Sequence, residues 1–256
     1  MMPSPSLDHP PRNRDPWKHG AVPVLGLIGG IGAGKSVAAR MLAERGAAVI
    51  DADAVGHELL TDPTIRARIV ERSGPGVLET GDGSTRRPNP AISRRALGAV
   101  VFADPAALRD LEAILHPAMR ERFRREIDRV ACEGRAPCIV LDAAVLLEAG
   151  WHDLCDHVVY VDAPRDERLR RVAAARGWTV SMLEARERSQ WPADRKRCRA
   201  DWILGNDGDL DRLGRELDRL VARLRSMDAP VEPRSHHETG PHDAASASRP
   251  GAARTS

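Results

Sequence analysis

Residues 26–36 read GLIGGIGAGKS, with five glycines and one lysine among eleven residues. From Gly29 to Ser36 the stretch fits the pattern G-x-x-x-x-G-K-[ST], in which glycines let several backbone N–H groups point at one phosphate. Apolar residues 22–28 come before it, and residues 35–46 after it have apolar side chains at helical spacing. The sequence therefore predicts a strand, an anion-binding loop, and a helix whose N-terminus also faces the anion.

The lysine and the serine of this loop have separate expected roles. Lys35 can neutralise the β- and γ-phosphates of a nucleotide, and the Ser36 hydroxyl can bind Mg²⁺. Lysine is rare in this chain: of the 39 Lys and Arg residues, only Lys18, Lys35 and Lys196 are lysines. Where arginine is the usual cation, a retained lysine indicates a need for a compact charge. The motif alone does not distinguish a kinase from a GTPase switch or a motor.

Composition limits the class of protein. The chain has 256 residues, of which 42% are hydrophobic and 30% charged, enough for one sizeable domain or one domain with an inserted lobe. A net charge of +2 argues against a whole-surface nucleic-acid binder, and no apolar run is long enough to span a bilayer. The four cysteines have no metal-ligand spacing, and the polar N-terminus lacks a signal-peptide core. We expect a cytoplasmic monomer or small homo-oligomer without nucleic-acid or membrane partners.

Apolar segments alternate with helical ones along the chain, which predicts an α/β fold. A doubly wound five-stranded parallel sheet is expected, of the type found in nucleotide kinases with a phosphate-binding loop, with the strand before the glycine loop at its centre. The expected strands are 22–28, 47–53, 138–144, 157–164 and 201–207, and the expected helices outside the lobe are 35–46, 165–176, 181–191 and 209–226.

The remaining segments set the domain boundaries. Residues 54–137 are too many for one crossover and contain helical patterns, so we expect an inserted helical lobe that faces the loop across a cleft. Residues 1–20 and 228–256 are rich in Pro, Ser, Gly and Ala and are interpreted as a disordered leader and tail. The phosphate-loop domain is then 21–227.

Acidic residues follow two of the expected strands. Asp51 and Asp53 end the second strand, on one side of the backbone because side chains alternate. A carboxylate there could orient an acceptor hydroxyl, accept its proton or help to hold Mg²⁺. The alternative is an acidic turn that starts the next helix. Asp142 follows four apolar residues and is a further candidate Mg²⁺ ligand, with helix capping as the alternative.

Arginines and one histidine complete the candidates. Arg171 and Arg176, in RLRRVAAARG, could supply positive charge during phosphoryl transfer, or form a solvated face with ion pairs. His116 precedes Pro117 and, read alone, is more typical of a helix boundary than of a catalytic group.

Five stretches, taken in order and spacing, resemble the dephospho-CoA kinase family. They are LIGGIGAGKS, IDADAVGHELL, ISRRALGAVVFADPAALRDLEAILHPAMRE, VLDAAVLLEAG and RSQ…RCRADWILGNDG, and the resemblance covers about residues 22–225. It implies transfer of the γ-phosphoryl group of ATP to the ribose 3′-hydroxyl of dephospho-CoA, the last step of coenzyme A synthesis, with Mg²⁺ accompanying ATP.

The resemblance also implies roles for single residues. Those implied to bind ATP are Gly32, Ala33, Gly34, Lys35, Ser36, Val37, Arg176 and Asn206, the last near the adenine. Those implied to bind the acceptor are Asp51, Asp53, His57 and His116. Lys35, Asp53 and Arg171 would be catalytic, with Asp53 as the base, while Ser36 and Asp142 would hold the metal.

Two departures and three alternatives remain. Val37 stands where the family often has Thr, and Ala144 stands where it usually has Pro, so we expect a looser turn beside Asp142. Another nucleotide or small-metabolite kinase should lack the His-Pro lobe motif. A switch GTPase should have an NKxD motif, and GNDGD is not one. An inactive descendant is disfavoured by the intact loop and by Asp53.

Overall fold

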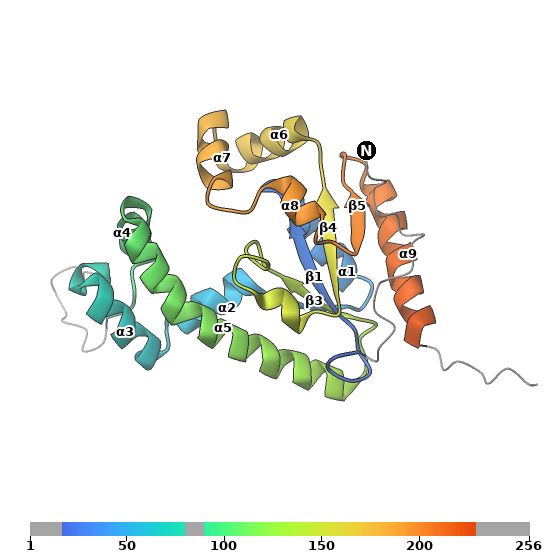
Figure 1. Ribbon diagram of the computed structural model, residues 1–256, viewed down its shortest axis with the longest axis horizontal. Helices are drawn as coiled ribbons and strands as arrows, with labels where there is room; N and C mark the ends of the chain where they lie inside the picture. Colours follow the sequence, from blue (N-terminus) through green and yellow to red (C-terminus); the bar gives the residue numbers. More distant parts are fainter. Residues whose placement is uncertain (1–16, 80–89, 229–256) are drawn as a thin grey trace, which may run out of the picture.

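A parallel five-stranded sheet forms the centre of the computed structural model, which describes residues 17–79 and 90–228. The strands are β1 (Val24–Gly29), β2 (Ala48–Asp51), β3 (Ile139–Asp142), β4 (His157–Asp162) and β5 (Trp202–Gly205). Their order is β2-β3-β1-β4-β5, and every pairing is parallel. The predicted sheet is confirmed, including the central position of the strand before the glycine loop (Figure 1).

Helices cover both faces of this sheet. They are α1 (Lys35–Ala43), α2 (Ala52–Leu59), α3 (Pro63–Ser73), α4 (Arg94–Ala103), α5 (Pro105–Glu133), α6 (Arg165–Arg176), α7 (Val180–Glu187), α8 (Ala193–Arg197) and α9 (Leu210–Asp228), with short 3₁₀ turns η1 (Pro75–Val77) and η2 (Trp151–Leu154). The second half of α5 and η2 pack on one face, while α1 and α9 pack on the other. The doubly wound arrangement follows from this division.

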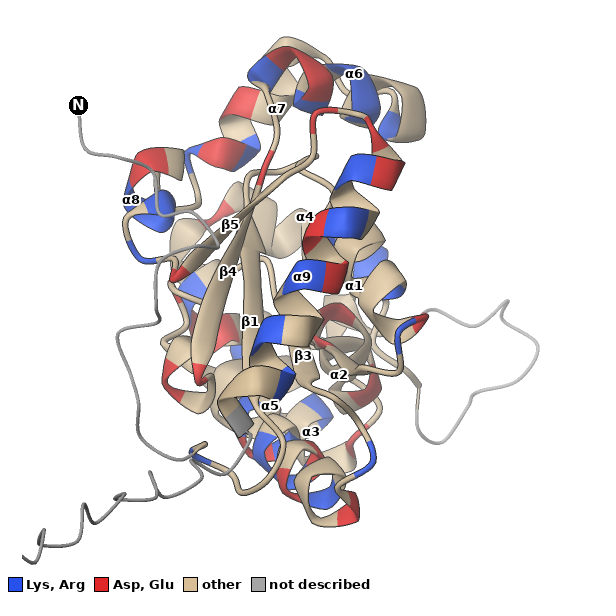
Figure 2. Ribbon diagram, turned by 90° about the vertical axis from the view of Figure 1, so that its right-hand side faces the viewer, with Lys and Arg blue, Asp and Glu red and all other residues tan. Residues whose placement is uncertain are grey.

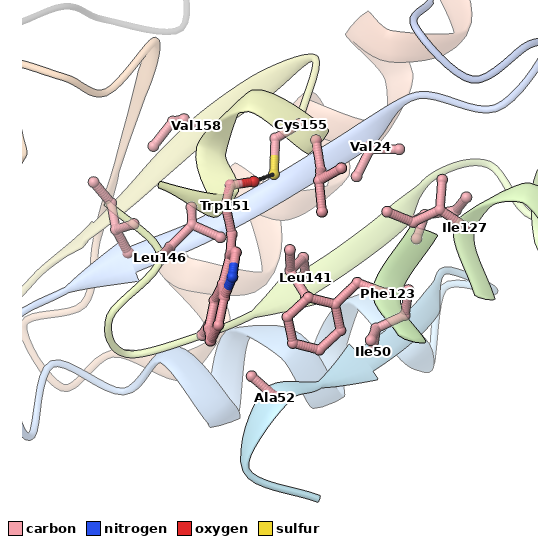
Figure 3. Packing of buried hydrophobic residues seen from close by; sticks show 14 of the residues in the cluster. Val24, Ile50, Ala52, Phe123, Ile127, Leu141, Leu146, Trp151, Cys155 and Val158 are labelled. Atoms are coloured by element: carbon pink, nitrogen blue, oxygen red, sulfur yellow. Dashed lines mark hydrogen bonds between the residues drawn. The ribbon is translucent and has the colours of Figure 1, made fainter. Parts of the chain in front are cut away.

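Alternation along the strands divides the apolar side chains between two cores. Leu141 of β3 faces Phe123 and Ile127 of α5 and Trp151 of η2, with the two aromatic rings edge to face at 5.0 Å (Figure 3). The neighbouring residue of β3, Val140, faces the opposite core. Strands buried on both faces in this way explain the near-continuous apolar runs in the sequence.

The last helix shows how an amphipathic pattern covers a sheet. Leu213, Leu217, Leu220 and Leu224 of α9 are at most 1% exposed and recur at helical spacing. Burying one such side chain contributes about 1.5–3 kcal/mol. Charged residues are found mainly on the helices and loops, and the strands are mostly free of them, as Figure 2 shows.

The inserted lobe has a small core of its own. Apolar residues of α3, η1, α4 and the first half of α5 form it, including Ile69, Val77, Leu97 and Ile114. The lobe therefore ends within α5, earlier than the expected boundary at residue 137, because the second half of α5 belongs to the core of the sheet. Residues 80–89 lie outside the described part of the chain.

Helix α5 continues through Pro117, so His116 is not at a helix boundary. A proline inside a helix removes one hydrogen bond and crowds the preceding turn, at a cost of about 3 kcal/mol. Ile114 is buried in the lobe core before the proline, and Phe123 and Ile127 are buried in the sheet core after it. Burial at both ends outweighs the proline and keeps the helix whole.

The N-terminal boundary also differs from the prediction. Trp17 packs against the core of the α1 and α9 face and meets the His157 ring edge to face, and Lys18 donates to the carbonyls of Asp153 and Cys155. Residues 17–20 therefore belong to the packed domain, four residues before the predicted start. The rest of the leader and the tail from residue 229 lie outside the described residues.

Within residues 17–79 and 90–228, no helix has the length and apolar character to cross a membrane.

Candidate active site

The glycine loop turns sharply between β1 and α1. Gly32 and Gly34 have φ angles of 77° and 94°, a region that side chains disfavour. A Cβ on Gly34 would lie 2.1 Å from Nδ2 of Asn206, so only glycine fits there. Helix α1 begins at Lys35 without a side-chain cap, which leaves its N-terminus open toward an anion.

Side chains from distant parts of the chain hold the back of this loop. The buried Asn206 donates from Nδ2 to the carbonyl of Ala33 at 2.8 Å. Arg171 of α6 donates from Nη1 to the same carbonyl at 3.3 Å and from Nη2 to the carbonyl of Asn206 at 3.0 Å. Arg168 donates to the carbonyl of Ile31 at 3.2 Å and is paired with Glu187. The loop is thus fixed before any phosphate arrives.

These contacts change the expectation for Asn206. The resemblance places it near the adenine, but its side chain is 2% exposed and bonded to the loop carbonyl. In this structure Asn206 supports the loop from behind. Arg171 has a similar position, with its guanidinium against the loop carbonyls.

Lys35, Ser36 and Asp142 form the charged centre of the site. Burial lowers the pKa of Lys35, and the charge of Asp142 opposes that shift. Burial raises the pKa of Asp142, while Lys35 and a hydrogen bond with Ser36 lower it. A hydroxyl and a carboxylate side by side are hard oxygen ligands of the kind that Mg²⁺ prefers, so these residues fit the metal that the sequence implies.

The remaining metal ligands would have to come from phosphates and water. Among the described residues, no group of three or more His, Cys, Asp and Glu side chains could hold a metal by itself. This pattern is typical of Mg²⁺ sites that use one or two protein ligands together with a nucleotide.

The two aspartates of the DAD segment lie differently from the prediction. Strand β2 ends at Asp51, which caps α2 by accepting hydrogen bonds from the backbone N–H groups of Asp53 and Ala54 at 2.8 and 3.1 Å. Asp53 therefore lies in the first turn of α2, not on the strand. The acidic turn that starts a helix, considered as the alternative for this pair, is what Asp51 forms.

Asp53 lies between the glycine loop and an apolar pocket. Its charge acts on both Lys35 and Asp142, and raises the pKa of each. On its other side it lines a pocket whose remaining residues are Ala52, Leu111, Glu112, Leu115, His116, Met119, Ala144, Val145 and Trp151. The start of α2, helix α5 and the segment after β3 form this pocket, and no residue of the glycine loop lines it, so the predicted cleft between lobe and loop stays a prediction.

The two histidines of the lobe have different surroundings. His116 lines the pocket and meets the Trp151 ring edge to face at 5.0 Å; burial lowers its pKa and Glu112 opposes that shift. His57 is exposed, does not line the pocket, and accepts a hydrogen bond from Arg94 at 3.2 Å. Of the two histidines, only His116 lines the pocket that Asp53 also lines.

Two further expectations concern α6 and the turn after β3. Arg176 stacks on the Trp178 ring at 4.9 Å and is close enough to Lys35 for its charge to lower the pKa of that lysine. The turn at Ala144, expected to be loose without proline, is held by a hydrogen bond of 3.2 Å from Lys196 Nζ. Val37 is partly buried against the core of the α1 and α9 face.

Arg168 and Lys196 contact the site but were not selected from the sequence. Arg168 stands in a run of arginines, where nothing distinguishes it from its exposed neighbour Arg170. The rarity of lysine was the one available signal for Lys196. Their partners, at Ile31 and Ala144, are far away in the sequence.

Comparisons with known proteins agree with this architecture. A family model described as "Dephospho-CoA kinase" matches residues 23–212. Curated dephospho-CoA kinases from Symbiobacterium thermophilum and Anaeromyxobacter dehalogenans are 44% and 43% identical to this chain, over 74% and 79% of it and 76% and 92% of their own lengths.

Solved structures have the same arrangement. A crystal structure of a Thermus thermophilus protein is 34% identical, with a TM-score of 0.65 over 79% of this chain and 98% of that one. A dephospho-CoA kinase from Campylobacter jejuni has a TM-score of 0.54 over 80% of this chain and 98% of that one, at 19% identity, a likeness that concerns the fold alone.

Proposed function

The chain belongs to the dephospho-CoA kinase family, and from that membership we propose that it transfers the γ-phosphoryl group of ATP to the 3′-hydroxyl of dephospho-CoA. The products are coenzyme A and ADP, and the reaction is the last step of coenzyme A synthesis. The observation that carries the assignment of roles is the position of Asp53, between the phosphate loop and the apolar pocket.

Asp53 is the proposed base. The ribose oxygen attacks the γ-phosphorus, the new O–P bond forms as the bond to the bridging oxygen of ADP breaks, and the hydroxyl proton passes to the Asp53 carboxylate. Such a group must reach the hydroxyl and also lie near the transferring phosphate. The electrostatic effect of Asp53 on Lys35 and Asp142, together with its place in the pocket lining, supports this role.

The glycine loop is the proposed ATP side. The N–H groups of Gly32–Val37 surround the phosphates, and Lys35 neutralises the charge on the β- and γ-phosphates. Ser36 and Asp142 are the proposed Mg²⁺ ligands, supported by their hydrogen bond at the loop. When bound with ATP, Mg²⁺ neutralises phosphate charge and orients the γ-phosphoryl group.

Arg171 is proposed to add positive charge to the phosphate side of the site, where its guanidinium donates to the carbonyls of the glycine loop. Arg176 is proposed to bind ATP through its exposed guanidinium. For Asn206 we propose indirect support of ATP through the loop, because its buried amide is bonded to Ala33.

The apolar pocket is the proposed acceptor side. His116 and Asp53 line it, and an apolar wall suits the adenosine part of the acceptor. Asp51 contributes by holding the first turn of α2, which carries Asp53. His57 is exposed, and we propose that it contacts the acceptor at the edge of the lobe.

A coupled ADP-release assay with ATP and Mg²⁺ tests the proposal. The acceptor panel contains dephospho-CoA, adenosine, nucleoside monophosphates and gluconate, so another nucleotide or metabolite kinase would reveal itself. Of these acceptors, we expect only dephospho-CoA to be phosphorylated. Equal or faster turnover with another acceptor would reject the assignment. We further propose a monomer or small homo-oligomer, which light scattering on the same sample measures.

A further inference from the structure

Lys196 of α8 is a charged side chain buried beside the active site. It is 1% exposed, although lysine is among the residues least often buried. Its ammonium lies 3.0 Å from Glu148 Oε1. It also donates to Gln190 Oε1 at 3.0 Å and to the carbonyl of Ala144 at 3.2 Å. An ammonium has three N–H donors, and these three partners use them all.

The partners belong to two separate segments. Ala144 and Glu148 are in the turn that follows β3, directly after Asp142. Gln190 is in the segment that returns from α7 to α8. Glu148 Oε1 also accepts a hydrogen bond from the backbone N–H of Trp191 at 2.8 Å. This one oxygen therefore binds both the Lys196 ammonium and the segment before α8.

This junction lies between the two halves of the site. Ala144 lines the proposed acceptor pocket together with Asp53. Lys196 and Gln190 line a second pocket with Gly30 and Ile31 of the glycine loop. Lys196 therefore links the two pockets: it bonds a residue that lines the acceptor pocket, and it lines the pocket beside the glycine loop itself.

We propose that Lys196 is a positioning residue for the acceptor, because its bond to the Ala144 carbonyl fixes part of the lining of the pocket that Asp53 also lines. The proposal rests on the proposed function and assigns no contact between Lys196 and either substrate. A lysine suits this place because its compact ammonium meets three acceptors at once. The planar fork of an arginine is wider and cannot take its position.

The alternative is a purely structural ion pair, and it makes a different prediction. Breaking a buried pair by removing one partner leaves an uncompensated charge and destabilises strongly. Here that charge would be Glu148, whose Oε2 has no hydrogen-bond partner among the described residues. Removing both charges together is often neutral for stability. A double variant can therefore separate stability from positioning.

The experiment compares four proteins: the parent, Lys196→Met, Lys196→Met with Glu148→Gln, and Lys18→Met. Glutamine at 148 keeps the oxygen that accepts from Trp191. Lys18 is the matched control, because its ammonium also donates to two carbonyls, of Asp153 at 3.1 Å and Cys155 at 2.5 Å, before β4 and away from the glycine loop. Each protein is measured for melting temperature, kcat, and KM for each substrate.

We expect the single variant to lose stability and the double variant to regain it. The double variant should still lose about 10- to 100-fold in kcat/KM for dephospho-CoA, the size typical of a misplaced reactant, with KM for ATP within about twofold. Lys18→Met should lower the melting temperature and leave both KM values unchanged.

Two results would overturn the proposal. One is a stable double variant with parent-like kcat and parent-like KM for dephospho-CoA. The other is a double variant that loses stability and in which KM for ATP and KM for dephospho-CoA change equally. That result would assign the pair a structural role only. A parent without turnover on dephospho-CoA would instead reject the proposed function itself.

Discussion

The two halves of the site differ in what lines them. On the phosphate side, Asn206, Arg171 and Arg168 hold the glycine loop by hydrogen bonds to its carbonyls. On the acceptor side, the pocket lining is mostly apolar: His116 meets the Trp151 ring edge to face, and the bond from Lys196 reaches only the backbone carbonyl of Ala144. A phosphate carries fixed charge that rewards a preformed cradle, whereas an apolar surface needs only shape and burial.

This difference predicts how each half responds to substitution. Changes on the phosphate side should act on catalysis or on KM for ATP, and changes in the pocket should act on KM for dephospho-CoA. Lys35→Ala should have the largest effect, because it removes a preorganised charge from the transferring group. We expect kcat to fall about 100- to 1000-fold, the usual loss for one such interaction. Lys18→Ala is the control, and a Lys35 variant with near-normal kcat would contradict the role.

Gly34→Ala should have the next largest effect. The new Cβ would lie 2.1 Å from Asn206 Nδ2, so the loop must move from its support. We expect KM for ATP to rise at least about tenfold, which corresponds to about 1.4 kcal/mol of binding free energy.

Gly150→Ala is the matched control for this variant. Gly150 also has a positive φ, 73°, but its Cβ would meet open space. It should cost only the roughly 1 kcal/mol of a strained backbone, read as a change in the free energy of unfolding, with both KM values unchanged. Equal kinetic effects of the two variants would show that the close approach to Asn206 is unimportant.

On the acceptor side, His116→Ala should raise KM for dephospho-CoA several-fold and leave KM for ATP nearly unchanged. Burial lowers the pKa of His116 from its usual value of 6.5, so the ring is neutral at neutral pH. In the parent protein, KM for dephospho-CoA should therefore not change with pH above neutral pH. It should rise only at lower pH, where the His116 ring gains a proton.

His57→Ala provides the comparison for that variant, since His57 is outside the pocket lining and is paired with Arg94. It should have a smaller effect on the same KM. A His116 variant that altered only KM for ATP would show that the pocket does not receive the acceptor.

The smallest expected effect is the difference in thiol reactivity between buried and exposed cysteines, which tests the packing of the central sheet. Burial raises the pKa values of Cys138 and Cys155 to about 12, so both remain protonated and unreactive at pH 8. Cys132 and Cys198 are exposed. A thiol reagent should label these two quickly and the buried pair only on unfolding. Rapid labelling of all four without loss of activity would show that the sheet opens more readily than its packing indicates.

The same contrast explains what the sequence could predict. The position of the glycine loop between a strand and a helix was predicted, because the motif depends on residue types at fixed spacing within one short segment. The strands followed from their apolar runs. Helix α5 was not predicted to continue through Pro117, because its stability comes from two cores formed by distant residues.

The supports of the site were the least predictable part. Asn206 was selected only from the resemblance, and its bond to Ala33, across more than half of the chain, was not predicted. Asp53 was expected on a strand, and the capping of α2 by Asp51 places it on a helix. Such contacts depend on how the elements pack, which no local pattern in one sequence records.

The account depends most directly on Asp53 as the group shared by the two halves, and Asp53→Asn tests it. Asparagine keeps the size and the hydrogen-bonding reach but loses the negative charge and most of the basicity. We predict a large fall in kcat with ATP binding near that of the parent, because an interaction made only in the transition state appears in kcat. A variant that turns over dephospho-CoA within a few-fold of the parent would contradict the account.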